Sequence, residues 1–244
     1  MASTTSDGAP FSGPLDSFDG EENHILLTNI NQNPNLGLYV YATDSYALVG
    51  KGLPERFVKA LKDVLKVPFH EITVAGTDMP GIFLAGNSHC LLVPGIAFPH
   101  ELRTLEHLKI KHAVIETDLT CLGNTILCND HHAYVSPEFT EKEVASIASH
   151  LQVPAIKMKL AKMPTPGALA VVNGKGMLVS NHISDEEATQ LATDFKIKVT
   201  GGTVNRGNQF IKSGLVCNGK GLAIGDQSGS PEVMNADEAL GFME

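Results

Sequence analysis

The chain has 244 residues, of which 43% are hydrophobic, so it is long and apolar enough to bury a sizeable core. Its 27 acidic residues outnumber its 18 basic residues and give a net charge of −9, which argues against a broad nucleic-acid-binding surface. No apolar run reaches the roughly 18 residues of a membrane-spanning helix. The N-terminus also lacks the basic start and apolar middle of a secretory signal. We therefore expect a soluble intracellular protein.

The first 24 residues form a polar and acidic segment. They contain no Lys or Arg, and they hold five of the acidic residues, Asp7, Asp16, Asp19, Glu21 and Glu22. Such a segment is too polar to fold by itself. We predict that residues 1–24 are a disordered acidic tail.

After this tail, one pattern recurs five times. Each copy is a short apolar run, a polar break of four residues and a second short apolar run, as in 169-LAVVNGKGMLVS-180. Asn and Gly accept the positive φ angles of tight turns, so each copy predicts a β-hairpin. The intervals between successive breaks are 44, 42, 44 and 45 residues, and the breaks begin at Thr43, Asn87, Asn129, Asn173 and Asn218.

An amphipathic helix is expected after each hairpin. Apolar residues at helical spacing occupy 54–67, 98–110, 140–153, 184–197 and, more weakly, 230–242. Thr140 with Glu143, and Ser184 with Glu187, match the capping box that opens a helix. The first four helices are followed by strand-like runs at 70–76, 112–117, 154–160 and 196–202.

The repeating unit is therefore strand, turn, strand, helix, strand. The fifth unit lacks its last strand, and the run 25–30 before the first hairpin can replace it. This exchange would close the chain into a ring without exposed sheet edges. We predict an α/β fold with a single domain over 25–244, and the alternative is two open α/β domains divided near residue 120. The predicted units are 36–76, 80–118, 122–160, 166–202 and 212–244.

The segment 201–229 contains eight glycines, but it is not a phosphate-binding loop. Lys220 has no Ser or Thr after it, and the spacing of the glycines does not match G-x-G-x-x-G. The segment instead joins units four and five and contains the fifth hairpin turn. Most of its glycines, and the Asn-Gly pairs at 173–174 and 218–219, are interpreted as turn formers.

Two further segments are more specific than hairpin chemistry requires, 122-LGNTILCND-130 and 202-GTVNRGNQFIKSG-214. Together with 86-GNSHCLLVP-94 and the five-unit ring, they resemble the archaeal and eukaryotic translation initiation factor 6 family. The resemblance runs from about Ile25 to Phe242. It implies the pentein fold, a closed ring of five ββαβ units with pseudo-fivefold symmetry.

The resemblance also implies a function in translation without catalysis or cofactor. Members of that family bind the intersubunit face of the large ribosomal subunit, against ribosomal proteins near the sarcin–ricin loop and with limited rRNA contact. There they block joining of the small subunit, and in eukaryotes they accompany late subunit maturation. The chain is expected to act as a monomer in the cytoplasm, and also in the nucleus and nucleolus if its source is eukaryotic, without binding DNA or membrane.

Family contacts lie at one end of the ring, where the first strand of each hairpin begins. Asn124 is the strongest single prediction, although its amide could also cap the local backbone. Arg206 carries donors suited to phosphate or carboxylate, or to turn carbonyls. The predicted ribosome-binding residues are Gly37, Gly81, Ile82, Gly123, Asn124, Asn205, Arg206 and Asn208.

Two other functions stay open from the sequence alone. Enzymes that modify guanidine groups share the five-unit fold and use a late cysteine, for which Cys217 is the candidate, but a cysteine nucleophile needs a neighbouring base. Cys217 lies in an apolar run that favours an inert thiol. A protein-binding scaffold without ribosome contact is the other alternative. The pair His131-His132 predicts no metal site, because adjacent strand side chains point to opposite faces.

Overall fold

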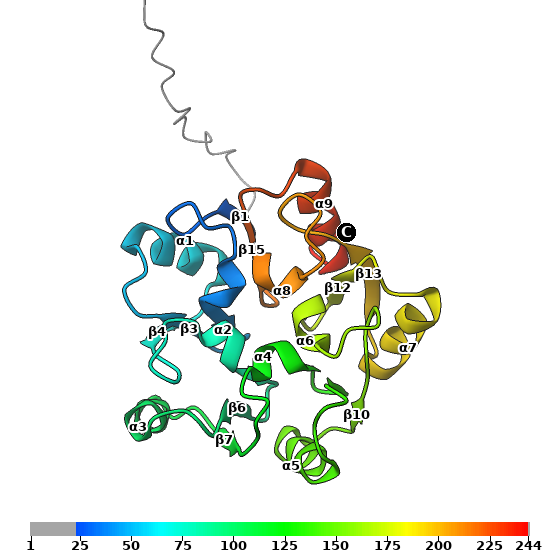
Figure 1. The fold of residues 1–244 in the computed structure, drawn as a ribbon. Helices are drawn as coiled ribbons and strands as arrows, with labels where there is room; N and C mark the ends of the chain where they lie inside the picture. Colours follow the sequence, from blue (N-terminus) through cyan, green and yellow to red (C-terminus); the bar gives the residue numbers. More distant parts are fainter. Residues whose placement is uncertain (1–22, 244) are drawn as a thin grey trace, which may run out of the picture.

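The computed structural model describes residues 23–243, so most of the predicted acidic tail lies outside the described part. The described residues form five three-stranded sheets arranged around a common axis (Figure 1). This is the predicted five-unit α/β ring.

Each sheet is built on the second strand of a hairpin. These middle strands are β3 (Ala47–Gly50), β6 (Leu91–Pro94), β9 (Ala133–Val135), β12 (Gly176–Ser180) and β15 (Leu222–Gly225). Their antiparallel partners are the first hairpin strands, β2 (Val40–Ala42), β5 (Ala85–Gly86), β8 (Ile126–Cys128), β11 (Ala170–Val172) and β14 (Leu215–Cys217).

A parallel strand completes each sheet. In four units it follows the helix of the same unit, as β4 (Phe69–Ile72), β7 (His112–Ile115), β10 (Ala155–Lys157) and β13 (Lys198–Gly202). In the fifth sheet this position belongs to β1 (Ile25–Thr28), which pairs with β15 in the register Ile25 to Leu222. The first strand of the fold therefore completes the last unit, as the sequence predicts.

The amphipathic helices lie on the outside of the ring (Figure 1). The sequence-based ranges are confirmed to within about three residues. The helices are α1 (Glu55–Leu65), α3 (Pro99–His107), α5 (Glu141–Leu151), α7 (Asp185–Phe195) and α9 (Ser230–Ala239). Both predicted capping boxes form, and the Thr140 and Ser184 side chains accept from the Glu143 and Glu187 backbone N–H groups.

One prediction about local structure is wrong. The segments that enter the hairpins are not strand starts but single helical turns, η1 (Leu36–Leu38), α2 (Pro80–Phe83), α4 (Leu122–Thr125), α6 (Pro166–Leu169) and α8 (Ile211–Gly214). The sequence pattern concealed them because a segment of three or four residues is too short to show helical periodicity. These five turns surround the axis of the ring (Figure 1).

Buried apolar residues form five clusters, and each cluster draws on two neighbouring units. The cluster between units two and three, for example, combines Leu92 and Ile115 with Leu122, Ile126 and Ile147. Because the apolar face of each sheet is covered partly by the next unit, a single unit cannot bury its own core. Closure of the ring is therefore part of the stability of every unit.

Candidate binding surface

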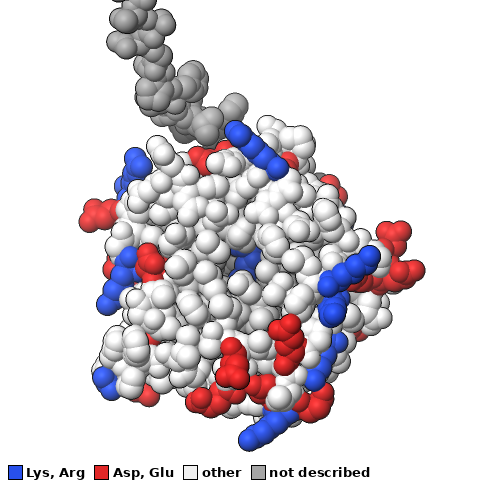
Figure 2. Space-filling view, in the orientation of Figure 1, with Lys and Arg blue, Asp and Glu red and all other residues white. Residues whose placement is uncertain are grey.

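The ring has two unlike ends. The five helical turns η1, α2, α4, α6 and α8 lie at one end, which we call the short-helix end. The five hairpin turns, which begin at Thr43, Asn87, Asn129, Asn173 and Asn218, lie at the other, which we call the hairpin-turn end. Figures 1 and 2 view the molecule from the short-helix end.

Glycines allow the helical turns to approach one another closely. A Cβ atom on Gly81 would lie 1.9 Å from the carbonyl oxygen of Gly37, and one on Gly123 would lie 2.2 Å from that of Gly81. Gly37 and Gly167 make equally close approaches to their neighbours. Gly37, Gly81 and Gly123 are buried, so their position in the fold is explained by packing of the ring.

The residue after each of these glycines lies at the surface of the short-helix end. Asn124 is half-buried in α4, and its backbone N–H donates to Cys121 O at 3.0 Å. Its side-chain amide makes no hydrogen bond with any described residue, so the local cap considered from the sequence does not form. Ile82 occupies the matching place in α2 and is also half-buried. Both side chains are available at this end.

The segment GTVNRG forms a tight turn between β13 and α8. Asn205 donates from Nδ2 to Pro34 O at 3.2 Å, and its backbone N–H donates to Ser228 Oγ at 2.9 Å. The bond to Pro34 joins two residues that are 171 positions apart in the sequence. Asn208 accepts from the Phe210 N–H and donates to Ser213 Oγ, so its side chain is used within the turn.

Arg206 differs from both asparagines. It is exposed, has φ of 63°, and its guanidinium makes no bond with the described residues. The carboxylate of Glu232 in α9 fixes the turn, because it accepts hydrogen bonds from the backbone N–H groups of Arg206 and Gly207 at 3.1 and 2.9 Å. Burial alone would raise the pKa of Glu232, but these hydrogen bonds and those from Thr203 and Gly229 lower it. The backbone of the turn is therefore fixed while the arginine head stays free.

The same device recurs in other units, and the sequence analysis did not detect it. Glu101 of α3 accepts the N–H groups of Ala75 and Gly76, and Glu187 of α7 accepts that of Ala161. Each glutamate is also the third residue of its helix, and its carboxylate accepts the N–H group of the residue before the helix, Phe98 or Ser184. The capping-box pattern of Glu187 was visible in the sequence, but its link to the preceding turn depends on the neighbouring unit.

The asparagines of the hairpin-turn end make hydrogen bonds within the fold. Asn218 Nδ2 donates to Thr43 O at 3.2 Å and to Leu65 O at 2.8 Å, while its Oδ1 accepts the N–H groups of Lys220 and Gly221. Asn87, Asn129 and Asn173 make the corresponding bonds to the next unit. These side chains are more than turn formers, because each one ties two units together.

Unit one lacks this connection. Its turn begins with Thr43, whose hydroxyl accepts from the Ser45 and Tyr46 N–H groups but donates to Tyr46 O in its own turn. Among the described residues, four of the five junctions between units carry an asparagine bridge, and the junction of units one and two does not.

The short-helix end is uncharged near its centre. In Figure 2 the charged side chains gather toward the edge of this face, and the middle is occupied by uncharged residues. The exception is a basic group at the bottom of a central hollow of about 300 Å³, where Lys212 belongs to the lining. A partner that approaches the centre of this face therefore meets mainly uncharged side chains.

Comparison with known sequences assigns the family. The family model described as "eIF-6 family" matches residues 25–239. The chain belongs to the eIF-6 family. It is 33% identical over 227 residues to Translation initiation factor 6 of Thermococcus onnurineus, covering 91% of this chain and all of the relative. It is 35% identical over 220 residues to Translation initiation factor 6 of Staphylothermus marinus, covering 88% and 97%.

Comparison of structures confirms the ring fold of this eIF-6 family member. A dimethylarginine dimethylaminohydrolase adduct with S-methyl-L-thiocitrulline aligns with a TM-score of 0.51 over 68% of each chain, at 10% identity. At that identity the likeness shows the fold alone.

In the present chain, burial raises the pKa of Cys217 to about 12. A thiol of this kind is protonated at neutral pH and is a poor nucleophile.

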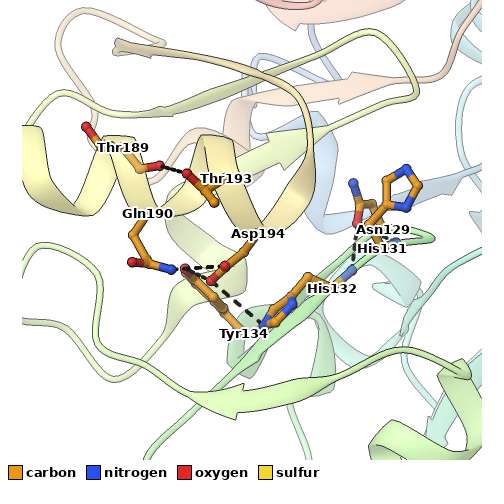
Figure 3. A network of polar contacts seen from close by, with 8 residues as sticks. All are labelled: Asn129, His131, His132, Tyr134, Thr189, Gln190, Thr193 and Asp194. Carbon is orange, nitrogen blue, oxygen red and sulfur yellow. Dashed lines mark hydrogen bonds and ion pairs between the residues drawn. The ribbon is translucent and has the colours of Figure 1, made fainter.

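A network of polar contacts that includes titratable side chains lies beside α7 (Figure 3). Asp194 accepts from Tyr134 Oη at 2.8 Å and from Gln190 Nε2 at 2.9 Å, and it lies 3.9 Å from His132 Nε2. Burial lowers the pKa of His132. The His131 ring points away from this group. Within residues 23–243, no three His, Cys, Asp or Glu side chains lie close enough together to hold a metal ion. The network connects β9 to α7 through the Tyr134–Asp194 hydrogen bond.

No helix in the described residues is both long and apolar enough to cross a membrane.

Proposed function

We propose that the protein binds the large ribosomal subunit through its short-helix end and thereby prevents joining of the small subunit, with a further role in subunit biogenesis. The observation that carries this proposal is the side-chain amide of Asn124, which makes no hydrogen bond with the described residues and lines the central hollow of that face. Membership of the eIF-6 family, which makes the protein a translation factor, supports it. The proposed activity is binding, without a catalytic step, in the cytoplasm.

The proposed contact residues divide into two groups. Ile82, Asn124 and Arg206 have side chains that reach the surface and are free to meet a partner. Gly37, Gly81 and Gly123 shape the face by holding the helical turns together, and Asn205 and Asn208 hold the turn that presents Arg206. Substitutions in the second group should act on binding through the fold.

The charge distribution predicts how binding depends on salt. The chain carries −9 overall, and its short-helix end is uncharged at the centre. Binding should therefore depend mainly on protein surface and shape, and only weakly on released counterions. We expect affinity to fall less steeply with salt than for a protein that neutralises many phosphates.

Sedimentation of purified ribosomal subunits tests the proposal. The protein should co-sediment with large subunits alone and should reduce the formation of joined ribosomes. Asn124→Ala and Arg206→Ala should each weaken co-sedimentation by about tenfold, because each removes hydrogen bonds to the partner. His131→Ala, an exposed substitution at the hairpin-turn end, is the matched control and should bind as the unchanged protein does. Normal subunit joining with no co-sedimentation would refute the proposal.

A further inference from the structure

A second cavity lies on the ring axis, on the opposite side of the helical turns from the central hollow. We call it the axial cavity. Its volume is about 400 Å³, its mouth is formed by the five hairpin turns, and Gly37, Gly167 and Lys212 lie at its inner end. This volume is in the range of sites that hold small organic molecules.

Lys212 stands where the repeat places a glycine. The second residue of the helical turn is Gly37, Gly81, Gly123 and Gly167 in the first four units, and it is Lys212 in the fifth. The four glycines leave the axis free of side chains, and the lysine reaches across it. Its Nζ donates to Gly123 O at 2.7 Å. Lys212 lines both the axial cavity and the central hollow, so it separates them.

The charge of Lys212 is not compensated. An ammonium has three donors, and Lys212 uses one of them, because no other hydrogen bond or ion pair joins its Nζ to the described residues. Burial lowers the pKa of Lys212 to about 8, so the amine is still largely protonated at neutral pH. A partly buried cation of this kind is stabilised when an anion reaches it.

The neighbouring groups of the cavity wall do not supply that anion. Burial raises the pKa of Cys128 to about 12 and that of Tyr41 well above its usual value, so both stay neutral. The Cys128 thiol donates to Gly86 O at 3.2 Å. Asp44 and Asp130 line the mouth, where they are exposed and accept from the Gly219 and Ser88 N–H groups across neighbouring turns.

The remaining wall selects the type of anion. Apart from the polar groups of the hairpin turns, it includes the apolar residues Val40, Leu127, Val171, Leu215 and Val216. Lys212 is the single Lys or Arg that the structure places at the inner end, so a dianion such as phosphate would bring a second charge without a partner. A carboxylate on an apolar body matches both the charge and the wall.

We propose that the axial cavity binds a small apolar monocarboxylate, with the carboxylate paired to Lys212 Nζ at the inner end and the apolar body against the hairpin strands. The site lies at the other end of the ring from the face proposed for the ribosome and does not depend on that function.

Calorimetric titration of the full chain with octanoate, octanol and octylammonium tests the charge requirement. Octanoate should bind at one site, and the other two at least tenfold more weakly, because only the carboxylate forms a charge-assisted hydrogen bond with the amine. Inorganic phosphate should not compete. Equal binding of octanoate and octanol, or no binding of octanoate, would overturn the proposal.

Two lysine variants locate the site. Lys212→Met should weaken octanoate binding at least tenfold. Lys196→Met removes an equal charge from the exposed mouth and should change binding less than twofold. Equal losses in both variants would show binding elsewhere. If Lys212→Met does not fold, the site can be located from the backbone amide NMR resonances of the unchanged protein. Octanoate should shift the resonances of Lys212 and Cys128, and shifts confined to other residues would overturn the proposal.

Discussion

The two ends of the ring use asparagine in opposite ways. At the hairpin-turn end, Asn218 is 3% exposed and its amide makes two donor and two acceptor bonds within the fold. At the short-helix end, Asn124 is half-buried, and its amide makes none with the described residues. A repeated asparagine is thus explained by the fold, whereas a single free one is a candidate for contact with a partner.

Asn218→Ala should produce the largest loss of stability. It leaves the carbonyls of Thr43 and Leu65 and the N–H groups of Lys220 and Gly221 without partners, so we expect a loss of about 4 kcal/mol in the free energy of unfolding. The matched Asn124→Ala should cost less than about 0.5 kcal/mol. Denaturant unfolding measures both, and equal costs would remove the distinction between the two ends.

Gly81→Ala tests packing at the short-helix end. The new Cβ would meet the Gly37 carbonyl oxygen at 1.9 Å, so the helical turns must move apart, at about 3 kcal/mol. Gly201→Ala is the control, because its Cβ would meet the nearest atom at an ordinary 3.5 Å. Similar midpoints of chemical unfolding for the two variants would show that the close approach of the turns does not limit stability.

Lys212, which lies between the two ends of the ring, makes the free energy of unfolding depend on pH. Its pKa is about 8 in the folded chain, against an ordinary 10.5, so between these values the unfolded chain binds more protons. Stability should therefore rise with pH through this window, by on the order of 2 kcal/mol. Lys212→Met should lack this part of the rise. The measurement is the difference between the two stability curves, and parallel curves would show that the amine is well solvated.

Thr43→Asn should give the smallest change in stability, and this change should be a gain. It places an amide at the junction of units one and two, which has no asparagine bridge. By analogy with Asn218, the new side chain should reach carbonyls of unit two and add about 1 kcal/mol. A rise in the thermal midpoint would show that an asparagine at this position can bridge units one and two. A fall or no change would show that the bridge does not form.

Much of the fold was predictable because local signals repeat. The intervals between Thr43, Asn87, Asn129, Asn173 and Asn218 revealed five units, and the amphipathic pattern located five helices. A run at 25–30 without a hairpin of its own predicted closure, which the pairing of β1 with β15 confirms. These features depend on residues near one another in the sequence, apart from the closure, which follows from a missing strand.

The site depended on contacts that no local pattern contains. The sequence marked Asn124 and Arg206, but only the structure shows that their head groups make no hydrogen bond with the described residues, whereas those of Asn205 and Asn208 do. The sequence also contains Lys212 at the position where the other four units have glycine. Only the structure shows that this side chain lies on the axis where the five helical turns meet. Backbone propensity and periodicity act over a few residues, so the sequence determined the units and their order. Which polar groups remain unpaired is decided by neighbours up to 213 positions away, and that required the tertiary structure.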